Sequence, residues 1–118
     1  KALTLAIQRV ISNIQEERNQ MLHLVCKGQH QKVKFNSIKY IESAGRKLNI
    51  YTQEGLYEIN MTMAEIMERL PKQFVVCHRS YVINLDKVMM VQGDVIQLST
   101  REMIPLSRSK HKEIAALL

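Results

Sequence analysis

The sequence predicts a mostly β fold, with about ten short antiparallel strands in small sheets, one short internal helix and a helix at each end. Between residues 21 and 106, short apolar runs recur about every ten residues, and turn-forming residues separate them. Only three segments repeat apolar residues at helical spacing: 1–14, 62–70 and 108–118. Strands that follow one another this closely pair as antiparallel hairpins.

The first nineteen residues have the pattern of an amphipathic helix. Leu3, Ile7, Val10, Ile11 and Ile14 recur three or four residues apart and form one apolar stripe. The stripe could pack on the helix's own domain, or the helix could join this domain to an upstream domain or to a second copy. Both interpretations stay open from the sequence.

Hairpins account for the first half of the predicted sheet region. Glycine stands at three of the four joints between the early strands, as Gly28, Gly45 and Gly55, where tight turns need a positive φ. Apolar and polar residues alternate along residues 47–52, as a half-buried strand requires. The strands predicted here cover residues 21–27, 31–35, 37–44, 47–52 and 56–60.

A short helix then interrupts the strands. Thr62 and Glu65 have capping-box spacing, in which the Thr hydroxyl accepts the backbone N–H of Glu65. Pro71 ends the helix because it disfavours helical dihedrals in the residue before it. Pro105 cannot donate to a ladder, so its strand is expected at a sheet edge, and Ser107 is predicted to cap the C-terminal helix. The remaining strands are predicted at 74–78, 80–84, 87–92, 95–99 and 102–106.

Length, charge and cysteine content narrow the class of protein. The chain has 118 residues, which suffices for one domain. Lys and Arg outnumber Asp and Glu by 17 to 11, and this surplus favours an anionic partner such as nucleic acid or a membrane surface. No apolar run approaches the roughly 18 residues that span a bilayer, and no signal peptide is visible. Cys26 and Cys77 cannot build a disulfide framework, so a cytoplasmic location is expected and a bridge between them is disfavoured.

Residues that carry enzyme chemistry are sparse. The sequence has no phosphate-binding glycine loop and no nucleophile motif. Cys77 and His78 are adjacent on a predicted strand, so their side chains should point to opposite faces. We therefore expect no enzyme activity, no cofactor and no metal site. Four histidines lack the spacing of metal ligands: His23, His30, His78 and His111.

Basic residues gather at predicted turns rather than along one helix. Arg46 follows a glycine turn, Arg79 lies between two apolar strands, and Arg108 follows the last strand. Most charged loop residues are simply solvated, but the polar residues 78–80 interrupt a buried pattern, which often marks a functional site. Arg pairs with guanine O6 and N7 while Lys and Ser contact phosphates, so the pattern favours duplex DNA. Aromatic residues make up only 5%, which disfavours binding of single strands by stacking.

Three stretches of the sequence carry a family resemblance. They are 35–52 (FNSIKYIESAGRKLNIYT), 62–88 (TMAEIMERLPKQFVVCHRSYVINLDKV) and 104–114 (IPLSRSKHKEI). In this order, the chain over residues 21–118 resembles the LytTR DNA-binding domain. The most specific part is 70–88, and the next is Pro-Leu-Ser-Arg followed by a basic helix. The resemblance implies ten strands in small antiparallel sheets with a short helix, in agreement with the strand count above.

The same resemblance implies a function. It implies sequence-specific binding of double-stranded DNA through loops inserted into successive major grooves, on direct repeats that two copies occupy as a dimer on DNA. It also implies the output domain of a response regulator in a bacterial two-component system, which regulates transcription below a receiver domain. Residues 1–20 would then be a linker helix from a missing upstream domain, and 21–118 the DNA-binding domain. A chain that begins without Met fits that division.

Candidate contacts follow from the resemblance by position. Family members often have a polar or imidazole side chain where Ala44 stands, so the expected contact moves to Arg46. Tyr81 and Asn84 also match the family pattern but are interpreted as structural, Tyr81 in the core and Asn84 as a turn cap. The base-contacting candidates are Arg46, His78, Arg79 and Arg108. The phosphate-contacting candidates are Lys47, Ser80, Lys87, Ser107, Ser109 and Lys110.

The competing hypothesis is a protein–protein or oligomerisation module whose basic surface is incidental. The amphipathic segment 1–14 supports it, because such a helix could pair with a partner. Salt distinguishes the two hypotheses: DNA affinity falls steeply with ionic strength, whereas apolar helix pairing does not.

Overall fold

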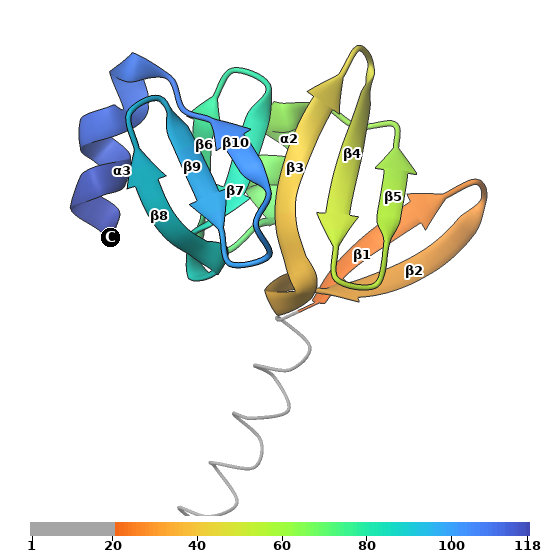
Figure 1. Ribbon diagram of the computed structural model, residues 1–118. Helices are drawn as coiled ribbons and strands as arrows, with labels where there is room; N and C mark the ends of the chain where they lie inside the picture. Colours follow the sequence, from red (N-terminus) through yellow and green to blue (C-terminus); the bar gives the residue numbers. More distant parts are fainter. Residues whose placement is uncertain (1–20) are drawn as a thin grey trace, which may run out of the picture.

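Ten strands in three antiparallel sheets make up most of the fold (Figure 1). The computed structural model describes residues 21–118, so the helix expected over 1–19 lies outside the described residues. Within the described range two short α-helices and three 3₁₀ turns (η) join the strands, and the predicted fold class is confirmed. The elements are β1 Met21–Cys26, β2 Gln29–Lys34, η1 Phe35–Ser37, β3 Ile38–Ala44, β4 Lys47–Thr52, β5 Leu56–Ile59, α2 Met63–Arg69, β6 Phe74–His78, β7 Tyr81–Asn84, η2 Leu85–Lys87, β8 Val88–Gln92, β9 Val95–Leu98, β10 Met103–Pro105, η3 Arg108–Lys110 and α3 His111–Leu117.

A five-stranded sheet in the order β5-β4-β3-β7-β6 forms the centre of the domain. Its hairpins β3–β4, β4–β5 and β6–β7 join neighbours in the chain, whereas β3 pairs with β7 across about forty residues. In that pairing Glu42 lies opposite Tyr81. The β3–β4 turn and the β6–β7 turn therefore lie side by side at the same end of the strands.

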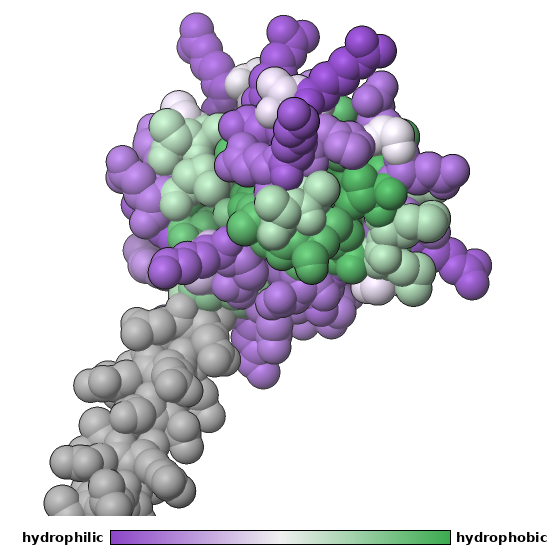
Figure 2. Space-filling view, turned by 90° about the vertical axis from the view of Figure 1, so that its left-hand side faces the viewer, coloured by the Kyte–Doolittle hydropathy of each residue, from purple (hydrophilic) through white to green (hydrophobic). Residues whose placement is uncertain are grey.

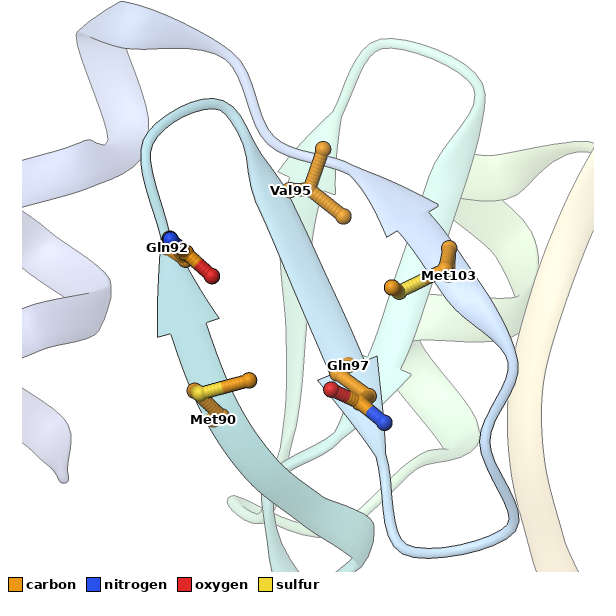
Figure 3. Close-up of a pocket in the computed structure, with 5 residues that line it drawn as sticks. All are labelled: Met90, Gln92, Val95, Gln97 and Met103. Atoms are coloured by element: carbon orange, nitrogen blue, oxygen red, sulfur yellow. The ribbon is translucent and has the colours of Figure 1, made fainter.

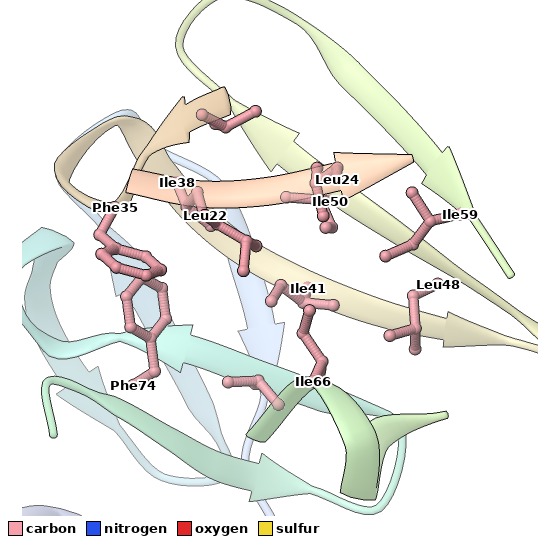
Figure 4. Close-up of a cluster of buried hydrophobic side chains, with 12 residues drawn as sticks. Leu22, Leu24, Phe35, Ile38, Ile41, Leu48, Ile50, Ile59, Ile66 and Phe74 are labelled. Atoms are coloured by element: carbon pink, nitrogen blue, oxygen red, sulfur yellow. The ribbon is translucent and has the colours of Figure 1, made fainter. Parts of the chain in front are cut away.

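Both faces of this sheet are covered, which gives two hydrophobic cores. The β1–β2 hairpin and α2 cover one face (Figure 4), while α3 and the three-stranded sheet β10-β9-β8 cover the other. Strand β7 serves both, because Val82 points into the first core and Ile83 into the second. The first core contains Leu22, Leu24, Val33, Phe35, Ile38, Ile41, Leu48, Ile50, Ile59, Ile66, Phe74 and Val82. The second contains Cys77, Ile83, Ile96, Leu98, Ile104, Leu106 and Ile114.

Local signals in the sequence are confirmed at most element ends. The hydroxyl of Thr62 accepts the Glu65 N–H at 3.2 Å, and α2 ends before Pro71. Strand β10, which contains Pro105, lies at the edge of its sheet. The side chain of Asn84 is fully buried. Its carbonyl oxygen accepts the Asp86 N–H at 3.0 Å and so caps the 3₁₀ turn η2.

The predicted cap of the C-terminal helix is wrong. Ser107 makes no side-chain capping bond, and a 3₁₀ turn over Arg108–Lys110 precedes α3, which begins at His111. The Ser107 N–H donates to the carbonyl of Cys77 at 2.8 Å, and its carbonyl accepts from Lys110 at 3.0 Å, which closes the 3₁₀ turn that separates Ser107 from α3. Ser107 is thus held against β6 in an extended conformation. No helix in residues 21–118 is both long and apolar enough to cross a bilayer.

Candidate nucleic-acid interface

Three loops that carry basic residues adjoin one another at one edge of the domain. They are the β3–β4 turn with Arg46, the β6–β7 turn with Arg79, and η3 with Arg108. The Ser43 N–H donates to the carbonyl of Ser80 at 2.8 Å, which joins the first two loops. The bond from Ser107 to the Cys77 carbonyl joins the second to the third. These loops form a row along the upper edge in Figure 1, here called the loop edge.

The arginines of the loop edge are free to bind an external anion. Arg46, Arg79 and Arg108 are all exposed. Within residues 21–118 the salt bridges involve three lysines and none of these arginines. Figure 2 shows hydrophilic side chains projecting from this upper edge above an apolar area on the side of α3.

Two lysine candidates are partly neutralised by neighbours. The ammonium of Lys47 lies 2.9 Å from Glu58 Oε1, and this pairing raises the pKa of Lys47 and lowers the pKa of Glu58. The ammonium of Lys110 lies 3.5 Å from the carboxylate of Glu113. Exposed pairs of this kind are weak, so either lysine can turn to a phosphate at small cost.

The candidate serines differ in exposure. Ser109 is exposed, whereas Ser80 and Ser107 are half-buried and their backbone groups hold the loops together. All three belong to the loop edge.

Lys87 is separated from the other candidates. It ends η2, which follows β7 at the end of that strand away from the loop edge (Figure 1). Its carbonyl accepts the Ser99 N–H at 2.7 Å, which places it beside the β9–β10 turn. One duplex lying along the loop edge would not contact this lysine, so we leave Lys87 out of the proposed interface.

The sequence did not predict that a fourth loop belongs to this edge. The β8–β9 turn contains Gly93 and Asp94, and the Asp94 carbonyl accepts the Leu106 N–H at 2.8 Å, just before η3. The turn itself was visible in the sequence, but it has no basic residue and therefore gave no signal. Its Asp94 carboxylate and the neighbouring Gln92 add an acidic and an amide group to the loop edge.

A β-bulge shapes the approach to the Arg79 turn. The pairing of β6 with β7 shifts between Val76 and His78, so the simple alternation that predicted opposite directions for Cys77 and His78 is interrupted here. The Cys77 thiol is buried, bonds the carbonyl of Pro105 at 3.4 Å, and has its pKa raised to about 12 by burial. His78 stays half-buried at the turn, and its Nδ1 accepts the Ser80 N–H at 3.2 Å.

Tyr81 packs against the second core, as expected, but at its boundary. It is half-buried, and its hydroxyl donates to Glu42 Oε2 at 2.8 Å. That hydrogen bond is the main cause that holds the pKa of Glu42 below its usual range. Tyr81 is therefore part of a polar cluster directly beneath the loop edge.

Other surfaces of the domain have a different character. An apolar hollow of about 240 Å³ lies on the outer face of the β8–β9–β10 sheet (Figure 3). On the β1–β2 hairpin, the rings of His23 and His30 stack with Nε2 and Nδ1 2.9 Å apart. Within residues 21–118 no group of three or more His, Cys, Asp or Glu side chains could hold a metal ion. The lining of the hollow is Met90, Gln92, Val95, Gln97 and Met103.

An antiparallel framework that presents exposed arginines on three joined loops defines a β-scaffolded domain with a basic edge. Comparison with known proteins specifies the class: residues 28–118 match the family model of the LytTr DNA-binding domain, and the chain belongs to that family. A solved LytTr DNA-binding domain from Bacillus cereus has the same fold, with a TM-score of 0.73 and 22% identity over 83% of this chain and 95% of that one.

Two curated relatives are regulators of greater length. The transcriptional regulatory protein YpdB of Escherichia coli K12 is 31% identical over 90 residues, which are 70% of this chain and 37% of YpdB. The sensory transduction protein LytT of Enterococcus faecalis is 31% identical over 74 residues, which are 58% of this chain and 31% of LytT. This chain therefore spans about a third of the length of these relatives.

Proposed function

We propose that this domain binds double-stranded DNA sequence-specifically, as the output domain of a bacterial response regulator that controls transcription. The observation that carries the proposal is the loop edge, where backbone hydrogen bonds hold three exposed arginines in one row. The proposed base contacts come from Arg46, His78, Arg79 and Arg108. The proposed phosphate contacts come from Lys47, Ser80, Ser107, Ser109 and Lys110.

The dimensions of the loop edge suit a duplex. Neighbouring strands lie about 4.8 Å apart, and one strand, β7, separates β3 from β6. The Arg46 and Arg79 turns are therefore on the order of 10 Å apart, and η3 continues the row on the β6 side. A major groove is about 12 Å wide. Turns about 10 Å apart therefore fit within one groove of that width. We propose that the arginines at the two ends of the row extend toward successive major grooves, which lie about one helical turn, or 34 Å, apart on one face of the duplex.

The wider assembly is also part of the proposal. We propose that two copies occupy direct repeats and that a receiver domain precedes this domain in the full-length protein. Residues 1–20 would be the linker helix between the two. Family membership and the greater length of YpdB and LytT support this division.

Selection of bound duplexes from a random pool tests the proposal. A specific binder enriches one motif, and direct repeats appear as two copies of that motif at a fixed spacing. The affinity for the selected duplex is then measured at increasing salt. Only charged contacts release counterions, so Lys47 and Lys110 alone predict a slope of log affinity against log salt of about −2, and each arginine that also meets a phosphate adds about −1. A pool that yields no motif, or an affinity that salt leaves unchanged, would refute specific DNA binding.

The alternative function, an oligomerisation module, would use the apolar hollow for a second copy of the chain. Met90 and Met103 remain substantially exposed there, at 46% and 63%. Analytical ultracentrifugation without DNA separates the two functions. A dimer that Met103→Glu dissolves, together with no salt-dependent binding of DNA, would favour the alternative.

A further inference from the structure

A chain of contacts joins Glu42 on β3 to His78 at the end of β6, and His78 is one of the proposed base-contacting residues. Glu42 on β3 accepts hydrogen bonds from the Tyr81 hydroxyl at 2.8 Å, from the Tyr51 hydroxyl at 3.3 Å and from the Asn49 amide at 3.3 Å. These donors favour the ionised carboxylate and hold the pKa of Glu42 low. Glu42 thus fixes the position of the Tyr81 hydroxyl.

Tyr81 in turn restrains the imidazole of His78. The two rings meet edge to face, with centroids 5.7 Å apart and planes at 66°. On its other side the His78 Nδ1 accepts the Ser80 N–H at 3.2 Å. Ser80 cannot easily move away, because its carbonyl is bonded to the Ser43 N–H on β3. The ring is therefore held by two independent contacts.

The hydrogen bond from Ser80 determines where the imidazole carries its proton. A ring nitrogen that accepts an N–H is unprotonated, so neutral His78 bears its proton on Nε2. Within residues 21–118 no protein group bonds to this Nε2, and no buried side-chain nitrogen or oxygen lacks a partner. The Nε2–H is therefore open to solvent and available to an external acceptor.

We propose that Glu42 and Tyr81 are positioning residues that hold His78 so that its Nε2–H donates to an acceptor atom on a base edge in the major groove. Guanine O6 and N7 and thymine O4 are acceptors of that kind. This inference rests on the proposed function and specifies the direction of the hydrogen bond at one of its contacts. The structure supplies the donor, its tautomer and the two residues that hold it.

The first test needs no DNA. Two-dimensional spectra that correlate the ring nitrogens and protons of ¹⁵N-labelled domain distinguish the two neutral tautomers. At a pH where His78 is neutral, we expect a protonated Nε2 and an unprotonated Nδ1. A proton on Nδ1 would overturn the inference, because the ring would then present an acceptor at Nε2.

The second test is a double-mutant cycle on the selected duplex. Tyr81→Phe removes the hydroxyl that bonds Glu42 and should weaken binding on the order of fivefold, a coupling typical of residues in contact. The same substitution in a His78→Ala background should have no further effect. Tyr51→Phe is the matched control, since it also removes a hydroxyl from Glu42, but the Tyr51 ring stacks on Tyr40 and not on His78, so it should leave affinity unchanged. Thermal melts establish that each variant folds.

The outcomes separate this inference from the proposed function. Two outcomes in a domain that still binds the duplex would overturn the positioning role alone. In one, Tyr81→Phe weakens binding as much in the His78→Ala background as in the wild type. In the other, Tyr51→Phe weakens binding as much as Tyr81→Phe. His78→Ala should relax the preference at one base pair. A uniform loss over all sequences would mean that Nε2–H meets a phosphate and would overturn the base contact. A domain that binds no duplex refutes the proposed function, and the base contact falls with it.

Discussion

Replacing Arg79 with alanine is the sharpest test of the loop edge. Arg79 is exposed at the two-residue turn between β6 and β7 and takes part in none of the salt bridges within residues 21–118. Its removal should therefore change the free energy of unfolding by less than about 0.5 kcal/mol. Any larger effect of the substitution on DNA binding would then come from the lost contact and not from a damaged fold.

The expected loss follows from the chemistry of the contact. A bidentate pair between arginine and guanine contributes about 1–3 kcal/mol of discrimination. Affinity for the selected duplex should accordingly fall on the order of 5- to 150-fold, since about 1.4 kcal/mol corresponds to a factor of ten. Affinity for an unrelated duplex should hardly change, because phosphate contacts dominate it.

The assay compares Arg79→Ala with a control that removes the same charge elsewhere. Arg101 lies at the β9–β10 turn, at the end of the domain away from the loop edge (Figure 1). Its backbone has a φ of +77°, a conformation that asparagine tolerates, so Arg101→Asn is the control with the least strain. Fluorescence anisotropy at one fixed salt concentration gives Kd for both variants on the selected and the unrelated duplex.

Two results would contradict the reasoning. Equal losses for Arg79→Ala and Arg101→Asn would mean that net charge matters and the loop edge does not. Wild-type affinity for Arg79→Ala would remove Arg79 from the interface, and the row of contacts would then have to be drawn without its central loop.

Four further predictions concern neighbouring features of the domain. Lys110→Ala should weaken binding to all duplexes alike and reduce the salt slope by about one, which a salt titration measures. Asn84→Ala should lower the free energy of unfolding in urea by about 2–4 kcal/mol, since it leaves the buried carbonyls of Phe35 and Ile38 without their partner; an unchanged midpoint would contradict this. Burial raises the pKa of Cys77 to about 12, so iodoacetamide should modify Cys26 first and reach Cys77 only on unfolding, as peptide mass spectrometry would detect. The low pKa of Glu42 means that its stabilising contribution is present above about pH 5 and is lost as pH falls, so Glu42→Gln should show a smaller loss of stability between about pH 5 and 3.

Features governed by neighbouring residues could be predicted from the sequence. The spacing of Thr62 and Glu65, the position of Pro71 and the alternation in β4 each depend on contacts within a few residues. Hairpin pairing is equally local, because a two-residue turn fixes the register of both strands. For these reasons the predicted ten strands and internal helix agree with the structure, while the predicted cap at Ser107 is wrong because a 3₁₀ turn lies between that residue and α3.

The arrangement of the candidate site depends on pairings that the sequence does not specify. The pairing of β3 with β7 brings the Arg46 and Arg79 turns together, and the bond from Ser107 to β6 adds Arg108. Nothing in the sequence distinguishes Lys87 from the other candidate lysines. In the structure, β7 runs away from the loop edge, so Lys87, which follows that strand, lies at the opposite end of the domain. Which turns share an edge follows from the sheet order, and that order is set by the packing of both cores.

The short turns also explain why a mostly β framework suits the proposed recognition. Ordering a flexible loop costs about 1–2 kcal/mol per residue, so three loose loops of a few residues each would forfeit most of the free energy that a few base contacts supply. Here the bond from Ser43 to Ser80 and the bond from Ser107 to Cys77 order the backbone before any ligand arrives. Only arginine and lysine side chains remain to be fixed, at about 0.5–1.5 kcal/mol each. The specificity that we propose for the arginines therefore depends on backbone hydrogen bonds between groups that do not contact the DNA. Breaking either bond should lower the affinity for the selected duplex more than the affinity for an unrelated one.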